Sequence, residues 1–278
     1  MTTRVVAVLA VLVLLVSSVR AADRQTQANV MTELTFTAAK GHPDPFNELT
    51  VDMVVTDPAN HTLRVPAFYA GRNTFKARYA SPLTGVHKFT TECSDPNDAG
   101  LQHVTGTIEV TPYAGTNPLY VHGPLRVSAN ARYIEHRDGT PFLWMGDTWW
   151  MGLTKRLAWP DEFKTLAADR KAKGFNVIQI VAGLYPDMPA FDARGDNEAG
   201  QPWEGGYARI RPEYFDAADT KILYLVEQGF TPCVVSTWGY HLPFMGEARM
   251  KQHQRYVYAR WGALPIVWAV AGEINMPY

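Results

Sequence analysis

The chain has 278 residues, of which 46% are hydrophobic and 19% are charged, and its formal net charge is −1. This length allows one large domain or two smaller ones, and the composition excludes a chain that is disordered throughout. The near-neutral charge and the lack of a Lys/Arg-rich run give no indication of a nucleic-acid partner.

The N-terminus has the pattern of a cleavable secretory signal. Arg4 precedes an apolar run from Val5 to Val16, and Ala21 follows at a position suited to cleavage. A membrane anchor is the alternative, but a spanning helix needs about 20 apolar residues and this run is shorter. We therefore predict a signal peptide over residues 1–21, a secreted or periplasmic protein, and no membrane association after cleavage.

Residues 31–112 alternate in the way that half-buried strands do. Turn clusters rich in Gly, Pro, Asn and Asp separate short strand-like segments, and no helical period is evident. We expect strands at 33–38, 49–55, 87–91 and 106–110. Short strands at such spacing predict an all-β sandwich. We assign an Ig-like β-sandwich domain to residues 28–113.

The pattern changes after a boundary at 113–118. Segments 125–128 and 132–136 predict a hairpin, and an apolar run follows at 142–146. Pro160 and Pro212 open helical segments that end at Gly174 and Gly229, and a third helix is expected at 249–260. Each is followed by an apolar strand: 177–181, 231–235 and 266–270.

Apolar strands that alternate with helices predict a parallel sheet covered by helices. A doubly wound sheet and a (β/α)8 TIM barrel both fit, but no Gly-rich phosphate loop follows a strand. A complete barrel takes about 250 residues, and this region holds four strands. We therefore interpret residues 119–278 as the first half of a barrel, truncated after strand 4, so that the chain is an N-terminal fragment.

Polar and aromatic side chains gather where these strands end, which is the active-site face of a barrel. Glu273 directly follows an apolar strand, where an unpaired charge is costly unless it serves a purpose. Carboxylates among aromatic rings are what a sugar site needs, because rings stack on sugar C–H faces and carboxylates bind hydroxyls or transfer protons. We propose Glu273 as the catalytic residue, with substrate-binding candidates Asp147, Trp149, Trp150, Gln179, Asp187, Trp238, Tyr240, His241 and Asn275.

Structural alternatives exist for several of these residues. Trp149 and Trp150 are adjacent, so at most one should face the site, and Asp147 has an alternative role as a cap. Trp144 and Trp268 lie inside apolar runs and are expected in the core. No histidine or cysteine spacing indicates a metal site, and we expect no cofactor.

Four segments resemble the apiosidase-like glycoside hydrolases. They are Gly139–Trp150, Gly174–Gln179, Gly183–Asp187 and Val267–Met276. Segment Val65–Gly71 resembles a β-sandwich domain of unknown function that often precedes this barrel.

The resemblance implies a (β/α)8 barrel and a retaining, double-displacement mechanism. The acid/base would end the fourth strand, as Glu273 does, and the nucleophile would come from a seventh strand that this sequence does not contain. Related barrels often show Asn-Glu at the fourth strand, whereas this chain has Gly272-Glu273.

Three functions follow from these observations. The first is a glycoside hydrolase acting on oligosaccharides or polysaccharides, with plant-type side chains as substrates, and inactive as this fragment alone. The second is a non-catalytic secreted carbohydrate-binding protein. The third is another hydrolase on the same barrel, such as a metal-dependent enzyme.

Overall fold

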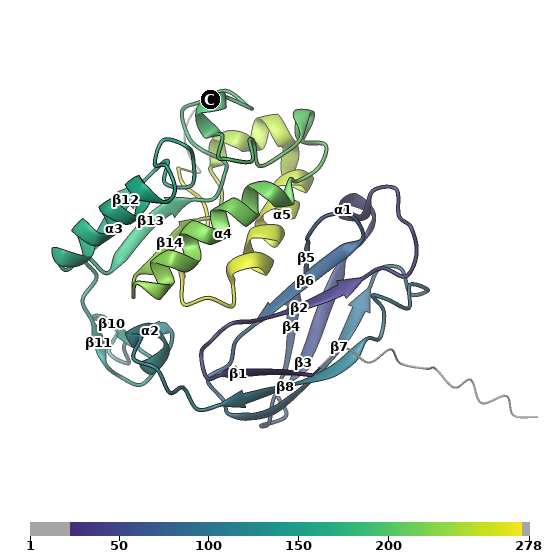
Figure 1. The fold of residues 1–278 in the computed structure, drawn as a ribbon, viewed down its shortest axis with the longest axis horizontal. Helices are drawn as coiled ribbons and strands as arrows, with labels where there is room; N and C mark the ends of the chain where they lie inside the picture. Colours follow the sequence, from purple (N-terminus) through teal and green to yellow (C-terminus); the bar gives the residue numbers. More distant parts are fainter. Residues whose placement is uncertain (1–22, 274–278) are drawn as a thin grey trace, which may run out of the picture.

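A computed structural model describes residues 23–273. The predicted signal peptide and Asn275 lie outside the described residues. A β region formed by the first part of the chain packs beside an α/β region formed by the second, and a small hairpin unit lies between them in the chain (Figure 1).

The β region contains two sheets. The larger has the order β1-β8-β7-β3-β4 and the smaller β2-β6-β5. The strands are β1 (Arg24–Gln27), β2 (Thr32–Thr37), β3 (Val51–Thr56), β4 (Thr62–Pro66), β5 (Phe68–Tyr69), β6 (Thr74–Tyr79), β7 (Gly85–Cys93) and β8 (Thr105–Thr111). Side chains of both sheets, among them Phe36, Met53, Phe75 and Ile108, belong to one hydrophobic cluster.

All four predicted strands of this region are present as β2, β3, β7 and β8. The alternating pattern did not reveal β1, which pairs parallel with β8 at the edge of the larger sheet. A short helix, α1 (Pro45–Glu48), corrects the expectation that no helix occurs here. Pro45 at its first turn explains it, because proline is preorganised for that position.

The connecting unit contains α2 (Pro118–Val121) and a three-stranded sheet of β9 (Leu125–Val127), β10 (Ile134–His136) and β11 (Pro141–Phe142). Antiparallel pairing of β9 with β10 confirms the predicted hairpin. The apolar run at 142–146 is not one strand, because Phe142 pairs with Ile134 in this unit. Leu143, Trp144 and Met145 are exposed between β11 and the next strand, so the core position expected for Trp144 was wrong.

The α/β region alternates strands and helices around a four-stranded parallel sheet of order β12-β13-β14-β15. The elements are β12 (Gly146–Trp149), α3 (Asp161–Ala172), β13 (Val177–Val181), α4 (Pro212–Glu227), β14 (Thr231–Val235), α5 (Leu242–Trp261) and β15 (Val267–Ala269). Short 3-10 helices occupy the loops at Ala193–Gly195, Gly205–Tyr207 and Gly239–His241. α5 starts before the predicted third helix, and Gly246 interrupts its regular backbone.

The two faces of this sheet have different surroundings. Ile178, Ile180 and Val234 point into the same hydrophobic cluster as Phe163 of α3 and Phe215 of α4. Val181 and Val235 belong to a second cluster with Tyr185 and Trp238, beside the ends of the strands. Because side chains alternate along each strand, one set faces the helices and the other set faces the opposite side of the sheet.

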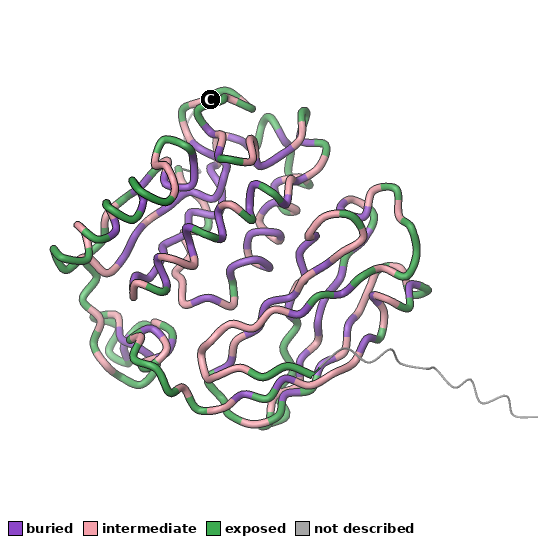
Figure 2. The backbone as a smooth tube through the Cα atoms, viewed as in Figure 1, coloured by how far each residue is buried: buried purple, intermediate pink, exposed green. Residues whose placement is uncertain are grey.

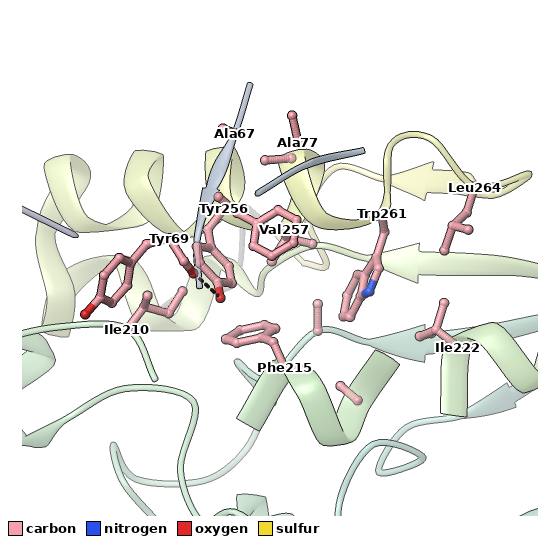
Figure 3. Close-up of a cluster of buried hydrophobic side chains, with 14 of the residues drawn as sticks. Ala67, Tyr69, Ala77, Ile210, Phe215, Ile222, Tyr256, Val257, Trp261 and Leu264 are labelled. Carbon is pink, nitrogen blue, oxygen red and sulfur yellow. Dashed lines mark hydrogen bonds between the residues drawn. The ribbon is translucent and has the colours of Figure 1, made fainter. Parts of the chain in front are cut away.

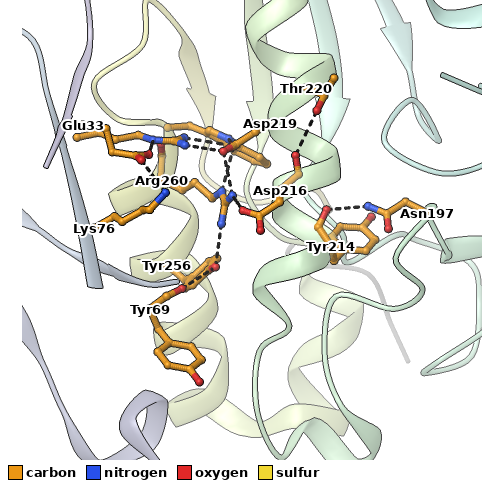
Figure 4. Close-up of polar contacts among 12 residues, drawn as sticks. Glu33, Tyr69, Lys76, Asn197, Tyr214, Asp216, Asp219, Thr220, Tyr256 and Arg260 are labelled. Carbon is orange, nitrogen blue, oxygen red and sulfur yellow. Dashed lines mark hydrogen bonds and ion pairs between the residues drawn. The ribbon is translucent and has the colours of Figure 1, made fainter. Parts of the chain in front are cut away.

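Helix α5 joins the two regions. Tyr256 donates from its hydroxyl to the carbonyl of Tyr69, 3.0 Å away, and its ring packs on Phe215 (Figure 3). Many residues of α5 and of the smaller sheet are buried where the two regions face each other (Figure 2). A buried ion-pair network formed by Arg78, Asp219 and Arg260 crosses the same interface (Figure 4).

Within residues 23–273, no helix is long and apolar enough to cross a bilayer.

Candidate functional site

A cavity of about 300 Å³ opens at the carboxyl ends of the parallel strands. Loops after β12, β13, β14 and β15 each contribute to its lining, which consists of Trp150, Met151, Pro186, Asp187, Trp238 and Glu273. Ligands of parallel α/β sheets bind at this end of the strands. Four of the residues predicted from the sequence therefore come together here: Glu273, Asp187, Trp150 and Trp238.

Glu273 follows β15 closely. The chain leaves β15 at Ala269, and Gly272 forms a parallel bridge with Trp238. Glu273 has a φ of 41° and is exposed. Its Oε2 accepts a hydrogen bond of 3.2 Å from Nε1 of Trp238. A carboxylate held at the mouth of a cavity by one donor is available to transfer a proton.

Two indoles form the aromatic part of the cavity. Trp150 is 48% exposed, whereas Trp238 is 4% exposed. Their ring centroids are 5.5 Å apart at 69°, an edge-to-face contact. Rings in this arrangement attract each other, because the edge of one carries positive charge and the face of the other negative charge. The contact leaves Trp150 accessible to a ligand.

Asp187 is the other carboxylate of the cavity. It is exposed in the loop after β13, with a φ of 55°. Within the described part of the chain, no hydrogen bond or ion pair engages its side chain. A free carboxylate beside an exposed aromatic ring can accept hydrogen bonds from sugar hydroxyls.

Asp147 lies on the helix side of the sheet and is not part of this cavity. Its Oδ2 accepts from Nε of Arg170 on α3 at 2.5 Å and from Nε1 of Trp149 at 3.0 Å. Burial acts to raise the pKa of Asp147, but the hydrogen bonds from Arg170 and Trp149 outweigh it and hold this pKa below the ordinary value. This ion pair ties β12 to α3, and a sugar contact of Asp147 stays a prediction.

Trp149 packs against the same helix as Asp147, and its predicted role in sugar binding stays a prediction. It is 6% exposed and its ring packs edge-to-face on Phe163 of α3, with centroids 5.2 Å apart. Asp147 and Trp149 are two residues apart on β12, so both side chains point to the helices. Trp150, the next residue, is the one that reaches the cavity.

Gln179 and His241 lie near the site without lining it. Gln179 is half-buried in the middle of β13, in register with Thr148 and Cys233. His241 is 5% exposed, and its Nε2 is 2.6 Å from the carbonyl of Tyr185. Burial lowers the pKa of His241. The buried imidazole supports the loop behind the cavity, and a contact of His241 with substrate stays a prediction.

Tyr240 is half-buried and packs against the cluster formed by Val181, Val235, Tyr185 and Trp238. It adjoins the cavity through Trp238. Met151 and Pro186 line the cavity but were not predicted. Each is next to a predicted residue in the sequence, but neither methionine nor proline has a polar or aromatic side chain that would mark it as part of a sugar site.

Between residues 23 and 273, no group of three or more His, Cys, Asp or Glu side chains is placed to hold a metal ion.

Comparisons with known proteins give the chain a family. The model of the apiosidase-like catalytic domain matches residues 128–278, and that of a domain of unknown function, DUF5060, matches residues 27–94. No curated protein matches.

Solved structures with similar folds include a candidate glycoside hydrolase from Bacteroides vulgatus ATCC 8482. It is 19% identical with a TM-score of 0.66, and the alignment covers 89% of this chain and 49% of that one. The present chain thus spans about half the length of this relative. A family 5 glycoside hydrolase from the same bacterium is 24% identical with a TM-score of 0.43, over 56% of this chain and 34% of that one.

The first of these likenesses shows a shared fold of β-sheets and an α/β region, as in glycoside hydrolases. The catalytic-domain model covers more than half of the chain and includes all four parallel strands and Glu273. This chain therefore belongs to the apiosidase-like family.

Proposed function

We propose that this chain carries the acid/base part of a retaining glycosidase active site, with Glu273 as the acid/base. One observation carries the proposal: an exposed carboxylate, shortly after the fourth parallel strand, lies in a cavity with two indoles and a second carboxylate. In such a mechanism Glu273 first protonates the oxygen of the leaving group. It then removes a proton from the water that hydrolyses the glycosyl-enzyme.

The corresponding architecture is the first half of a (β/α)8 barrel over residues 119–278, preceded by an Ig-like β-sandwich domain over residues 28–113. A retaining enzyme needs a nucleophile about 5–5.5 Å from the acid/base. Asp187 follows β13, two strands away from β15. We therefore assign Asp187 to substrate binding, expect the nucleophile from a seventh strand, and expect the 278-residue chain alone to be inactive.

The proposed substrate is an oligosaccharide or polysaccharide, with side chains of plant type. Trp150 offers an accessible ring face to a sugar, and Asp187 offers acceptors for its hydroxyl groups. Removal of residues 1–21 during export would place the protein outside the cytoplasm, where such polymers occur.

A second candidate function is sugar binding without cleavage, because the same rings and carboxylates suffice for binding. The two functions can be separated with the longest chain that the gene encodes. Calorimetric binding of oligosaccharides and release of reducing sugar are measured for the wild type and for Glu273→Gln. A glycosidase loses hydrolysis and keeps binding in this variant. Binding without hydrolysis in the wild type would reject the catalytic proposal in favour of the second function.

A further inference from the structure

The residue before Glu273 has no side chain, and the structure gives a reason. The indole of Trp238 lies over Gly272 so closely that a Cβ at position 272 would be 2.3 to 2.5 Å from three carbons of its six-membered ring. Separations below about 3.0 Å do not occur for real Cβ atoms. Any other residue at 272 would therefore have to displace the indole.

Backbone hydrogen bonds leave Gly272 little freedom to move away. The amide of Gly272 donates to the carbonyl of Thr237 at 3.0 Å, and the amide of Gly239 donates to the carbonyl of Gly272 at 3.1 Å. These bonds bracket Trp238 and extend the pairing of β14 with β15 beyond the strands themselves. The ring and the glycine are consequently fixed to each other from both sides.

Glu273, by contrast, has few constraints of its own. Its φ of 41° is unusual for a residue with a side chain, and it is exposed. Among the described residues, Nε1 of Trp238 is the one hydrogen-bond donor to its carboxylate. An exposed glutamate without such a donor samples several rotamers.

We infer that Trp238 is the positioning residue of Glu273, and that Gly272 is required because it allows the indole to reach the carboxylate. The inference rests on the proposed function of Glu273. Acid/base groups must be held within about 0.5 Å of their productive position. The packing of Trp238 against Gly272 and Trp150 supplies that restraint, and its N–H transmits it to the carboxylate.

The contact can be tested without turnover in the 278-residue chain with ¹⁵N-labelled indoles. We expect the N–H resonance of Trp238, identified by its loss in Trp238→Phe, to change with pH because its partner is a carboxylate. This pH dependence should vanish in Glu273→Gln. It should also vanish in Gly272→Ala, because the added methyl group displaces the ring.

Asp187 is the other titratable group of the cavity, and Asp187→Asn should leave the dependence in place. Trp144→Phe is a matched control: Trp144 is 40% exposed and outside the cavity, so the resonance of Trp238 should not change. Retention of the other indole resonances shows that each variant is folded. The inference would be overturned if the resonance of Trp238 kept its pH dependence in Glu273→Gln or in Gly272→Ala.

Kinetics of the longest encoded chain separate this inference from the proposed function. Loss of a hydrogen bond to a charged group predicts a fall in kcat of about tenfold for Trp238→Phe, with little change in KM. Gly272→Ala should lower kcat by a similar factor. The double variant Gly272→Ala/Trp238→Phe should have nearly the same kcat as Trp238→Phe, because phenylalanine lacks the outer ring carbons that a Cβ at position 272 would meet. Normal kcat in Trp238→Phe, with Glu273→Ala inactive, would reject the positioning role and keep the catalytic one. An active Glu273→Ala would reject the proposed function.

Discussion

Arg78 on β6 and Asp219 on α4 form a bidentate ion pair across the interface between the β region and the α/β region. The guanidinium nitrogens lie 3.2 and 2.5 Å from the two carboxylate oxygens. Asp219 also accepts from Arg260 and from Nε1 of Trp261, and all four side chains are buried. The two regions therefore share a charged centre as well as apolar core.

Removing Asp219 should destabilise both regions together. Asp219→Ala leaves Arg78 and Arg260 buried without their shared partner, which typically costs about 3–5 kcal/mol. Urea unfolding followed by far-UV circular dichroism and by tryptophan fluorescence measures the loss. Glu247→Ala is the control, since its pair with Lys251 is exposed on α5 and should matter little. A loss in Asp219→Ala no larger than in the control would contradict this role.

His253 should make the folded chain sensitive to moderate acid. It is fully buried on α5, where it accepts from Nε1 of Trp203 and its Nε2 lies 2.9 Å from the carbonyl of Ser236. Burial lowers the pKa of His253 from 6.5 to about 4. The unfolded chain therefore binds a proton near pH 6.5, whereas the folded chain does not until about pH 4.

The stability due to neutral His253 is thus present above pH 6.5 and lost as the pH falls toward 4. The change amounts to roughly 3 kcal/mol, because each pKa unit corresponds to about 1.4 kcal/mol. The free energy of unfolding, measured between pH 7 and 4, should fall less steeply in His253→Gln than in the wild type. His61→Gln removes an exposed histidine and serves as control. Equal slopes in His253→Gln and the wild type would refute the assignment.

Trp149 and Trp150 should separate stability from sugar binding. Trp149→Ala removes a buried ring from the contact with Phe163 and should cost about 3–5 kcal/mol in the free energy of unfolding. Trp150→Ala should change stability little but weaken oligosaccharide affinity roughly two- to tenfold, as expected for loss of one stacking ring. Thermal unfolding and calorimetric titration check the pair, and the reverse pattern would exchange the two roles.

Much of the fold could be predicted because the residues that begin and end its helices act locally. Pro160, Gly174, Pro212 and Gly229 mark helix ends through their own backbone preferences, and the largely apolar strands β13 and β14 indicate burial on both faces. The parallel pairing of β1 with β8 and the Arg78–Asp219 pair could not be predicted, because they join residues far apart in the sequence.

The location of the site could be predicted from the sequence, but the residues that line it could be predicted only in part. A strand end is visible in the sequence, but the face to which each residue points depends on where the strand begins. Asp147 and Trp149 were assigned to the site because they lie at a strand end, and in the structure both contact residues of α3. The presence of Gly272 was evident, but its cause, the indole of Trp238, emerges only from the pairing of β14 with β15.

Chemical rescue tests whether Glu273 is the acid/base of a retaining glycosidase. Glu273→Ala is made in the longest chain that the gene encodes and assayed on aryl glycosides with a good leaving group. Glu247→Ala, which removes an exposed carboxylate on α5, is the control. We expect turnover to fall by roughly 10²–10⁴-fold. Azide should restore part of it, because azide attacks the glycosyl-enzyme without a base. Unchanged kinetics of Glu273→Ala on both activated and natural substrates would contradict the claim.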